Sequence, residues 1–195
     1  MAQSARIQGL ASGRIGGVSL SEVLRSRAQT VDADILVLLA PDGRLLAGTE
    51  DMPVGAAFPL LPVIAASLQS RQSMNGIEIL GEQDMARISA NLAAEAAVPI
   101  VATARADSAR QGVERRGMFL VATAPMFDGA GSFNGIIVIG RLLNRDTGIA
   151  DYVTDLISIN GPLVGRVTGT VTVFLGDIRI ATSVRTADGQ RAIGT

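Results

Sequence analysis

The chain has 195 residues, a mass of 20.1 kDa and a formal net charge of −1, which suits one domain or two small modules. It contains no His, Cys or Trp, and all 17 basic residues are Arg. The commonest general base, zinc–thiolate sites, disulfides and cysteine nucleophiles are therefore excluded. Carboxylate- or Ser-based enzymes remain open, whereas scattered arginines and 3% aromatic residues argue against a nucleic-acid partner.

The sequence contains no candidate membrane anchor. No stretch approaches the roughly 18 consecutive apolar residues of a spanning helix, and the opening Met-Ala-Gln-Ser lacks the apolar core of a signal peptide. We therefore expect any segment that delivers or anchors this chain to lie outside the sequence.

Short helices and strands are expected in the first half of the chain. Ser19 followed by Glu22 is the pattern of a capping box and predicts a helix to about Gln29. The apolar runs 34–40 and 44–48 flank a Pro-Asp-Gly turn and predict a β-hairpin. The remaining elements expected here are two helices and one strand, at 60–71, 83–97 and 76–80.

The second half of the chain begins with a long loop, 99–116, and continues with longer strands. Strands are expected at 118–127 and 135–143, followed by a helix at 146–158. A last hairpin is expected at 169–184. The strands joined by hairpins predict an α+β fold, with an antiparallel sheet flanked by helices.

The two hairpins resemble each other in sequence. Residues 37–46 and 172–181 align at an offset of 135 residues, and both contain an apolar strand, a turn, Asp-x-Arg and a second apolar strand. Downstream, Val54-Gly55 echoes Ile193-Gly194. Such a match predicts two copies of one supersecondary unit, and chance similarity between hairpins is the alternative.

Several segments resemble the tandem (double) Cache sensor regions of bacterial chemoreceptors and sensor histidine kinases. The resemblance covers about residues 30–195, and the two C-terminal blocks are its most specific part. The segments that carry it are Ala93–Arg105, Glu114–Met118, Val121–Pro125, Gly140–Arg145, Gly169–Val184 and Asp188–Thr195.

The resemblance implies PAS-like Cache modules in the periplasmic portion of an inner-membrane receptor, with a homodimer as a candidate assembly. It divides the chain into an N-terminal helical segment (1–30), a membrane-distal module (31–150), and a linker helix with the start of a membrane-proximal module (151–195). Two departures from the family are expected. The leading helix is short or interrupted by Gly, and the proximal module is cut off after Thr195.

Two arginines of the long loop are candidate ligand contacts. Arg105 and Arg116 stand at its two ends, and a guanidinium group recognises carboxylate or phosphate in a bidentate manner. Pairing with Asp107 and Glu114 is the structural alternative.

The strands that follow supply the other candidates. Met118, Ala122 and Thr123 lie on the strand after the loop, where small side chains leave room for a ligand or for a packed helix. Arg141 ends the last long strand. Asn144, close behind it, is expected to cap the next helix.

We expect a ligand-binding sensor and not an enzyme, with no catalytic residue, no cofactor and no metal site. The ligand would be a carboxylate or another small metabolite, held between the sheet of the first module and the loop 99–117. A dimeric spacer of the same fold, with a filled interior, is the alternative, and a carboxylate- or Ser-based enzyme is the third hypothesis. The hairpin 169–184 is expected to be disordered, docked on the first module or paired with another chain.

Overall fold

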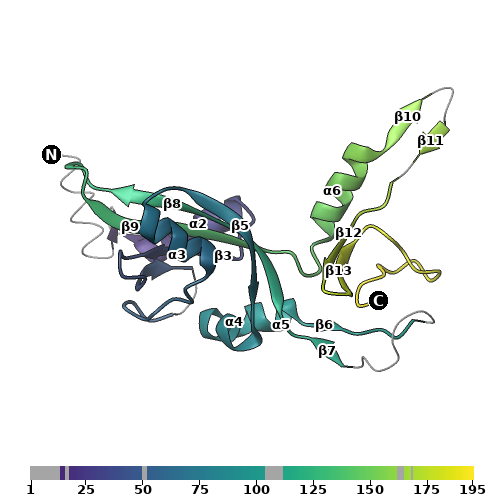
Figure 1. Ribbon diagram of the computed structural model, residues 1–195, viewed down its shortest axis with the longest axis horizontal. Helices are drawn as coiled ribbons and strands as arrows, with labels where there is room; N and C mark the ends of the chain where they lie inside the picture. The colour runs from purple at the N-terminus through teal and green to yellow at the C-terminus, as the bar shows by residue number, and fades with distance from the viewer. Residues whose placement is uncertain (1–13, 16–17, 50–51, 104–111, 162–164, 168) are drawn as a thin grey trace.

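The computed structural model describes residues 14–15, 18–49, 52–103, 112–161, 165–167 and 169–195 (Figure 1). These residues contain five helices and a five-stranded antiparallel sheet, so the predicted α+β fold class is confirmed. The sheet has the spatial order β4-β3-β9-β8-β5. Its strands are β3 (Ile35–Leu39), β4 (Leu45–Gly48), β5 (Met74–Leu80), β8 (Gly117–Phe127) and β9 (Phe133–Leu142).

Helices cover both faces of the sheet (Figure 1). Successive side chains of a strand point to opposite faces, so β3 sends Val37 and Leu39 into one core and Leu36 and Leu38 into another. The larger core also contains residues of α3 (Pro62–Ser70), α4 (Glu82–Ile88) and α5 (Ala90–Ala96), and the smaller one residues of α2 (Leu20–Thr30). The sheet is therefore buried on both sides where these helices lie.

The capping box predicted at Ser19 is confirmed. The Ser19 hydroxyl accepts a hydrogen bond from the Glu22 amide at 3.2 Å, and the Glu22 carboxylate accepts one from the Ser19 amide at 2.9 Å. Both bonds satisfy amides that a helix start otherwise leaves free. Before the helix, β1 (Arg14–Ile15) pairs with β2 (Val18–Ser19).

The helix expected over 83–97 is wrong as a single element. Ser89 has extended backbone angles, φ −158° and ψ 136°, so the chain breaks into α4 and α5 at this residue. Ser is a poor residue for a helix interior because it competes for backbone hydrogen bonds. Both short helices still bury their apolar residues, Met85 and Ile88 in α4 and Leu92 and Ala96 in α5.

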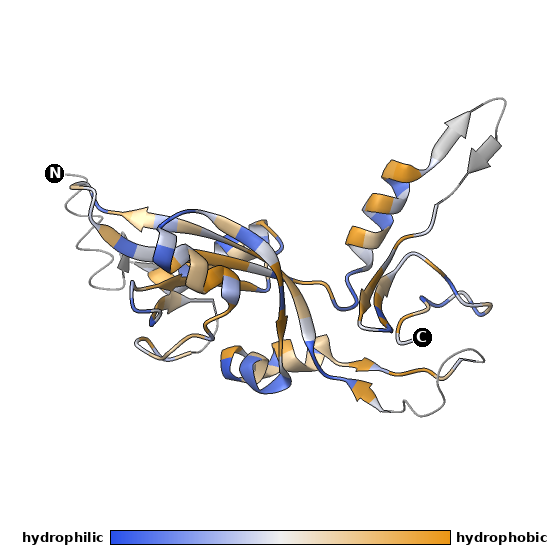
Figure 2. Ribbon diagram, viewed as in Figure 1, coloured by the Kyte–Doolittle hydropathy of each residue, from blue (hydrophilic) through white to orange (hydrophobic). Residues whose placement is uncertain are grey.

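The C-terminal part of the chain forms a second group of elements beside the sheet (Figure 1). The helix α6 (Thr147–Ile157) confirms the expected helix and runs across the domain boundary expected between residues 150 and 151. Its exposed face is partly apolar, with Leu156 67% and Ile157 48% exposed (Figure 2). Two hairpins follow, formed by β10 (Ile159–Gly161) with β11 (Gly165–Val167), and by β12 (Thr172–Leu175) with β13 (Ile178–Thr182).

The last hairpin is docked and ordered. Leu175, Ile178 and Ile180 form a core with Val98 and Leu143, so the hairpin packs against the end of the sheet domain, one of the three outcomes expected from the sequence. Val98 belongs to β6 (Val98–Pro99), which pairs with β7 (Val113–Glu114). The described ends of the long loop therefore lie beside this hairpin and do not cover the sheet.

The two similar hairpins share a detailed hydrogen-bond pattern. The strand register shifts between Leu38 and Leu39 in the first hairpin and between Val173 and Phe174 at the aligned position of the second. Downstream of each hairpin, a glycine with positive φ contacts the second strand of that hairpin. These glycines are Gly55, with φ +83°, and Gly194, with φ +85°.

Reciprocal backbone bonds complete that pattern. The Gly55 amide donates to the Leu45 carbonyl, and the Leu45 amide donates to the carbonyl of Ala56. In the second hairpin, the Gly194 amide donates to Arg179, whose own amide donates to the carbonyl of Thr195. The two hairpins are therefore similar in backbone structure, but Leu45 corresponds to Arg179, one residue away from the sequence alignment, because the second turn is one residue shorter.

Candidate functional site

A polar cleft lies where the end of α2, the start of β3 and the end of β9 meet. Three neighbouring hollows open there, with volumes of about 420, 350 and 240 Å³, and Asp34 lines all of them. Asp32 and Glu95 each line two of the three. The cleft has the size of a small-molecule site and is lined mainly by polar and charged residues.

Asp34 is the partly buried centre of this cleft. Its carboxylate accepts a hydrogen bond of 2.6 Å from the Leu142 amide, which ties the start of β3 to the end of β9. Burial raises the pKa of Asp34, the Leu142 hydrogen bond opposes this rise, and the neighbouring Asp32 charge adds to it. No arginine forms an ion pair with Asp34 among the described residues.

Arg141 connects the cleft to helix α6. Its guanidinium group contacts Asp32 at 3.0 Å and Asp146 at 2.7 Å. The other carboxylate oxygen of Asp146 accepts the Ile149 amide at 3.1 Å and so caps α6. A change in the pairing of Arg141 therefore reaches the first turn of this helix.

The cap predicted at Asn144 is wrong, since Asp146 caps the helix. Asn144 is buried, with 5% of its surface exposed. Its side-chain oxygen accepts the Met118 amide at 2.9 Å, and its nitrogen donates to the carbonyls of Ala96 at 2.6 Å and Arg116 at 3.0 Å. Asn144 therefore joins α5, β8 and the end of β9.

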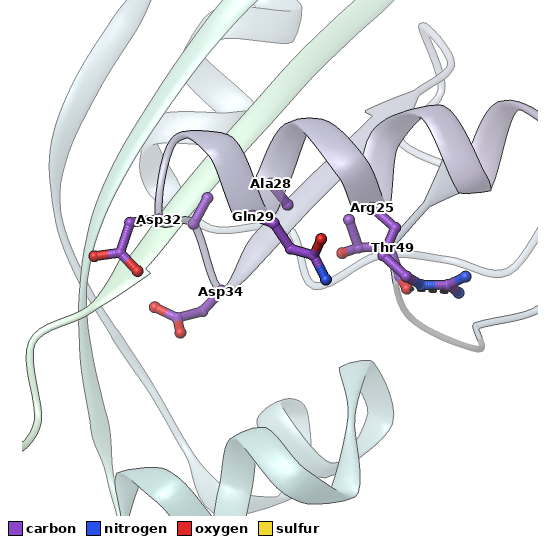
Figure 3. A pocket seen from close by; sticks show the side chains of 7 residues that line it. Arg25, Ala28, Gln29, Asp32, Asp34 and Thr49 are labelled. Atoms are coloured by element: carbon purple, nitrogen blue, oxygen red, sulfur yellow. Dashed lines mark hydrogen bonds between the residues drawn. The ribbon is translucent and has the colours of Figure 1, made fainter.

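Arg25, in the middle of α2, and Thr49, just after β4, line the cleft on the side away from Asp32 and Asp34 (Figure 3). The Arg25 guanidinium donates to the Thr49 carbonyl at 3.2 Å. The Thr49 side chain is 7% exposed, and its hydroxyl has no hydrogen-bond partner among the described residues. Figure 3 shows the Asp32 and Asp34 carboxylates pointing to the same side, beyond the last turn of α2.

Of the described residues predicted as ligand contacts, only Arg141 lines this cleft. Arg105 lies outside the described residues. Arg116 forms a two-bond ion pair with Glu114, with distances of 2.9 and 2.7 Å, as the alternative interpretation expected.

The strand residues among the candidates do not come together. Thr123 is buried in the sheet, where its hydroxyl bonds the Met74 backbone. Met118 packs at the edge of the core of the last hairpin. Met118 and Ala122 lie on the face of β8 opposite to Thr123, because side chains alternate along a strand. These three residues therefore cannot line one pocket.

The Arg116–Glu114 pair gives a test of the loop-based site. We expect Arg116→Ala to lower the free energy of unfolding at neutral pH by about 0.5–1 kcal/mol and to leave ligand binding unchanged. The pair lowers the pKa of Glu114 from its ordinary value of 4.5, so its stabilisation is present above that value and is lost as the pH falls through the lowered pKa. Urea unfolding of the original protein and of Arg116→Ala, at neutral and at acidic pH, measures this difference in stability. If Arg116→Ala loses ligand binding, the ligand site is at the loop 99–117 and not at the cleft.

The residues Asp32, Asp34 and Glu95 were missed by the sequence analysis. The signal available was the pair Asp32-Ala-Asp34 directly between a helix and an apolar strand. No group of three or more carboxylates in the described part of the chain is arranged to hold a metal ion. The described lining of the cleft consists of hydrogen-bonding, charged and a few apolar groups.

One comparison finds a similarity between the C-terminal part of the chain and a known family. Residues 141–195 match the family described as Single cache domain 3. The match supports a Cache sensor domain. Cache domains are extracellular small-molecule sensor modules and are generally not enzymes, and the α+β structure is consistent with a PAS-like Cache fold. No curated protein matches the chain.

The Cache match begins at Arg141, the residue that pairs with Asp32 at the cleft. It then includes the α6 cap, α6 and the last hairpin. None of the described helices is both long and apolar enough to cross a membrane.

Proposed function

We propose that this chain is the ligand-binding part of an extracytoplasmic sensor in a transmembrane receptor, of the chemoreceptor or sensor-kinase type. The observation that carries this proposal is the Cache match over residues 141–195. The cleft around Asp34 supports it, because it lies beside the first residues of the matched segment. The ligand would be a small molecule held by the charged groups of the cleft.

We further propose that the chain contains two related units, as in tandem Cache regions. The hairpins β3–β4 and β12–β13 support the proposal. Both have the same register shift, and in both a downstream glycine with positive φ contacts the second strand. The core around Leu175 and Ile180 includes Val98 and Leu143 of the first unit, so it is the place where the second unit would pack on the first. In this arrangement the first unit holds the sheet and the second begins near Asp146.

The contacts of Arg141 provide a route from the cleft to the second unit. A ligand that displaces Asp32 would change the pairing of Arg141, and Arg141 holds the Asp146 side chain that caps α6. Such a ligand biases the two arrangements by its difference in affinity for them, typically about 1–3 kcal/mol. The signal would then continue along α6.

A structural spacer is the second candidate function. The face of the sheet against α3, α4 and α5 is filled by a continuous apolar core, as expected of a spacer. The other face leaves Ile77, Ile79 and Leu120 between 44% and 53% exposed. In a spacer, these neighbouring side chains would be covered by a second subunit.

A thermal-shift screen separates the two functions. We expect at least one compound in a panel of carboxylates, amino acids, phosphates, purines and amines to raise the melting temperature by several degrees. A ligand at about 100 times its dissociation constant stabilises a fold by about 2.7 kcal/mol, which is a shift of several degrees for a chain of this size. No shift with any compound of the panel would contradict the sensor and favour the spacer.

A further inference from the structure

The chain between β9 and α6 (Figure 1) forms a strained turn. The Asp146 amide donates to the Leu143 carbonyl at 3.2 Å and closes a β-turn over residues 143–146. Arg145, the third residue of this turn, has φ +60°. A positive φ at the third residue is the feature of a type II turn, in which Gly is the usual residue, because a Cβ atom makes the left-handed region costly. Here the position is occupied by Arg.

Contacts to two distant segments hold Arg145 in this conformation. Its amide donates to the Ile180 carbonyl of β13 at 2.6 Å, and its guanidinium group donates to the Ala97 carbonyl, just after α5, at 2.6 Å. Ile180 is buried in the core that joins the last hairpin to Val98 and Leu143. The Ile180 carbonyl is in place only while the hairpin is docked, so docking maintains the strained turn.

A second conformation of the same turn is open to this sequence. Rotation of the peptide group between Asn144 and Arg145 converts a type II turn into a type I turn, in which the third residue has a negative φ and most side chains fit. The rotation also reverses the direction of the Arg145 N–H group, so the bond to Ile180 is lost. The docked hairpin therefore favours one turn, and the strain at Arg145 favours the other.

The turn also borders the cleft. Asn144, Arg145 and Asp146 line the hollow of about 350 Å³, and Asp146 pairs with Arg141 at 2.7 Å. A ligand in this hollow would lie against the turn and would compete with the Ala97 carbonyl for the Arg145 guanidinium group. The balance between the two turns is thus open to a ligand.

We infer that the turn 143–146 is a two-state switch, in which the peptide before Arg145 rotates as the last hairpin undocks from the sheet domain. Backbone strain that the surrounding structure holds in place is typical of such switch regions. The inference rests on the proposed sensor function for its use, because a ligand in the cleft favours one turn by its difference in affinity for the two. It adds a backbone change to the route from Arg141 to α6.

Hydrogen exchange of two matched variants tests this inference in the whole chain. Arg145→Gly and Arg145→Ala both remove the guanidinium group, but only Gly adopts a positive φ without strain. The Val101 amide donates to the Gly194 carbonyl at 2.8 Å and reports undocking. It should exchange about tenfold faster in Arg145→Ala than in Arg145→Gly. Equal exchange of Val101 in the two variants would overturn the inference.

A second pair of variants separates undocking from a general loss of stability. Arg71 ends α3 with φ +56°, so Arg71→Ala and Arg71→Gly differ in strain in the same way. The exchange of Val101 should be the same in these two proteins. If the Arg71 pair changes it as much as the Arg145 pair does, the hairpin does not undock separately and the inference is overturned.

Nuclear Overhauser effects report the rotation itself. In the type II turn the Asn144 Hα proton lies close to the Arg145 amide proton, whereas after the rotation the two amide protons lie close together. We expect the first pattern in the original protein and the second in Gly194→Ala, in which the Cβ atom would meet the Pro99 carbonyl and displace the C-terminal segment. The first pattern in a folded Gly194→Ala protein would overturn the coupling of the turn to docking.

The outcomes for the switch and for the sensor function are distinguishable. If the thermal-shift panel gives a ligand but the Arg145 variants do not differ, the sensor stands and the switch is overturned. If the variants differ but no compound of the panel binds, the switch stands as a property of the fold and the sensor is contradicted.

Discussion

We expect Asn144→Ala to lower the free energy of unfolding by about 3 kcal/mol. The change removes three hydrogen bonds of 2.6–3.0 Å from a side chain that is 5% exposed. It leaves the Met118 amide and the Ala96 carbonyl without this partner, and each buried polar group so orphaned costs about 1–3 kcal/mol. Urea unfolding at neutral pH measures the loss.

Two variants control this prediction. Asn144→Asp keeps the acceptor for Met118 but places a carboxylate against two carbonyl oxygens, so it should be at least as damaging as Asn144→Ala. Asn91→Ala, an exposed change on α5, should stay within about 0.5 kcal/mol. A loss below about 1 kcal/mol for Asn144→Ala would show that Asn144 does not hold α5, β8 and β9 together.

We expect Gly194→Ala to lower the free energy of unfolding by a similar amount, about 3 kcal/mol. A Cβ atom at Gly194 would lie 2.0 Å from the Pro99 carbonyl oxygen, and its φ of +85° strains any other residue. Relief of the clash would separate the C-terminal segment from the chain after β6, where the Val101 amide donates to the Gly194 carbonyl at 2.8 Å.

Gly55→Ala is the matched control for this prediction. Gly55 has nearly the same φ and the equivalent pair of backbone hydrogen bonds, but nothing lies within 4 Å of its Cβ position. It should therefore cost only the backbone strain, about 1–2 kcal/mol. Equal losses for the two variants in urea unfolding would contradict the docking of the C-terminal segment against β6.

Local sequence patterns predicted the elements that depend on local interactions. The Ser19–Glu22 pair predicted the start of α2, because both members of a capping box lie within one turn. The alignment of 37–46 with 172–181 predicted two similar hairpins, and the structure shows the same register shift in both. Each of these features depends on interactions within one short segment of the chain.

The site could not be predicted in the same way, because distant segments build it. Asp34 meets the Leu142 amide across 108 residues of sequence, and α5 adds Glu95 from a third segment. Asn144 satisfied the local rule for a helix cap, yet its partners lie 26 and 48 residues away. A local rule cannot choose between Asn144 and Asp146, since both residue types are good caps.

The central claim is that a small molecule binds at the Asp34 cleft and acts on α6 through Arg141 and Asp146. An amide NMR titration of the chain, with the compound that gives the largest thermal shift, tests it most directly. We predict that the amides of Leu142 and Ile149 shift most, because Asp34 and Asp146 accept their hydrogen bonds. Shifts centred instead on Met74 and Thr123, or no change at Ile149 under saturation, would contradict it.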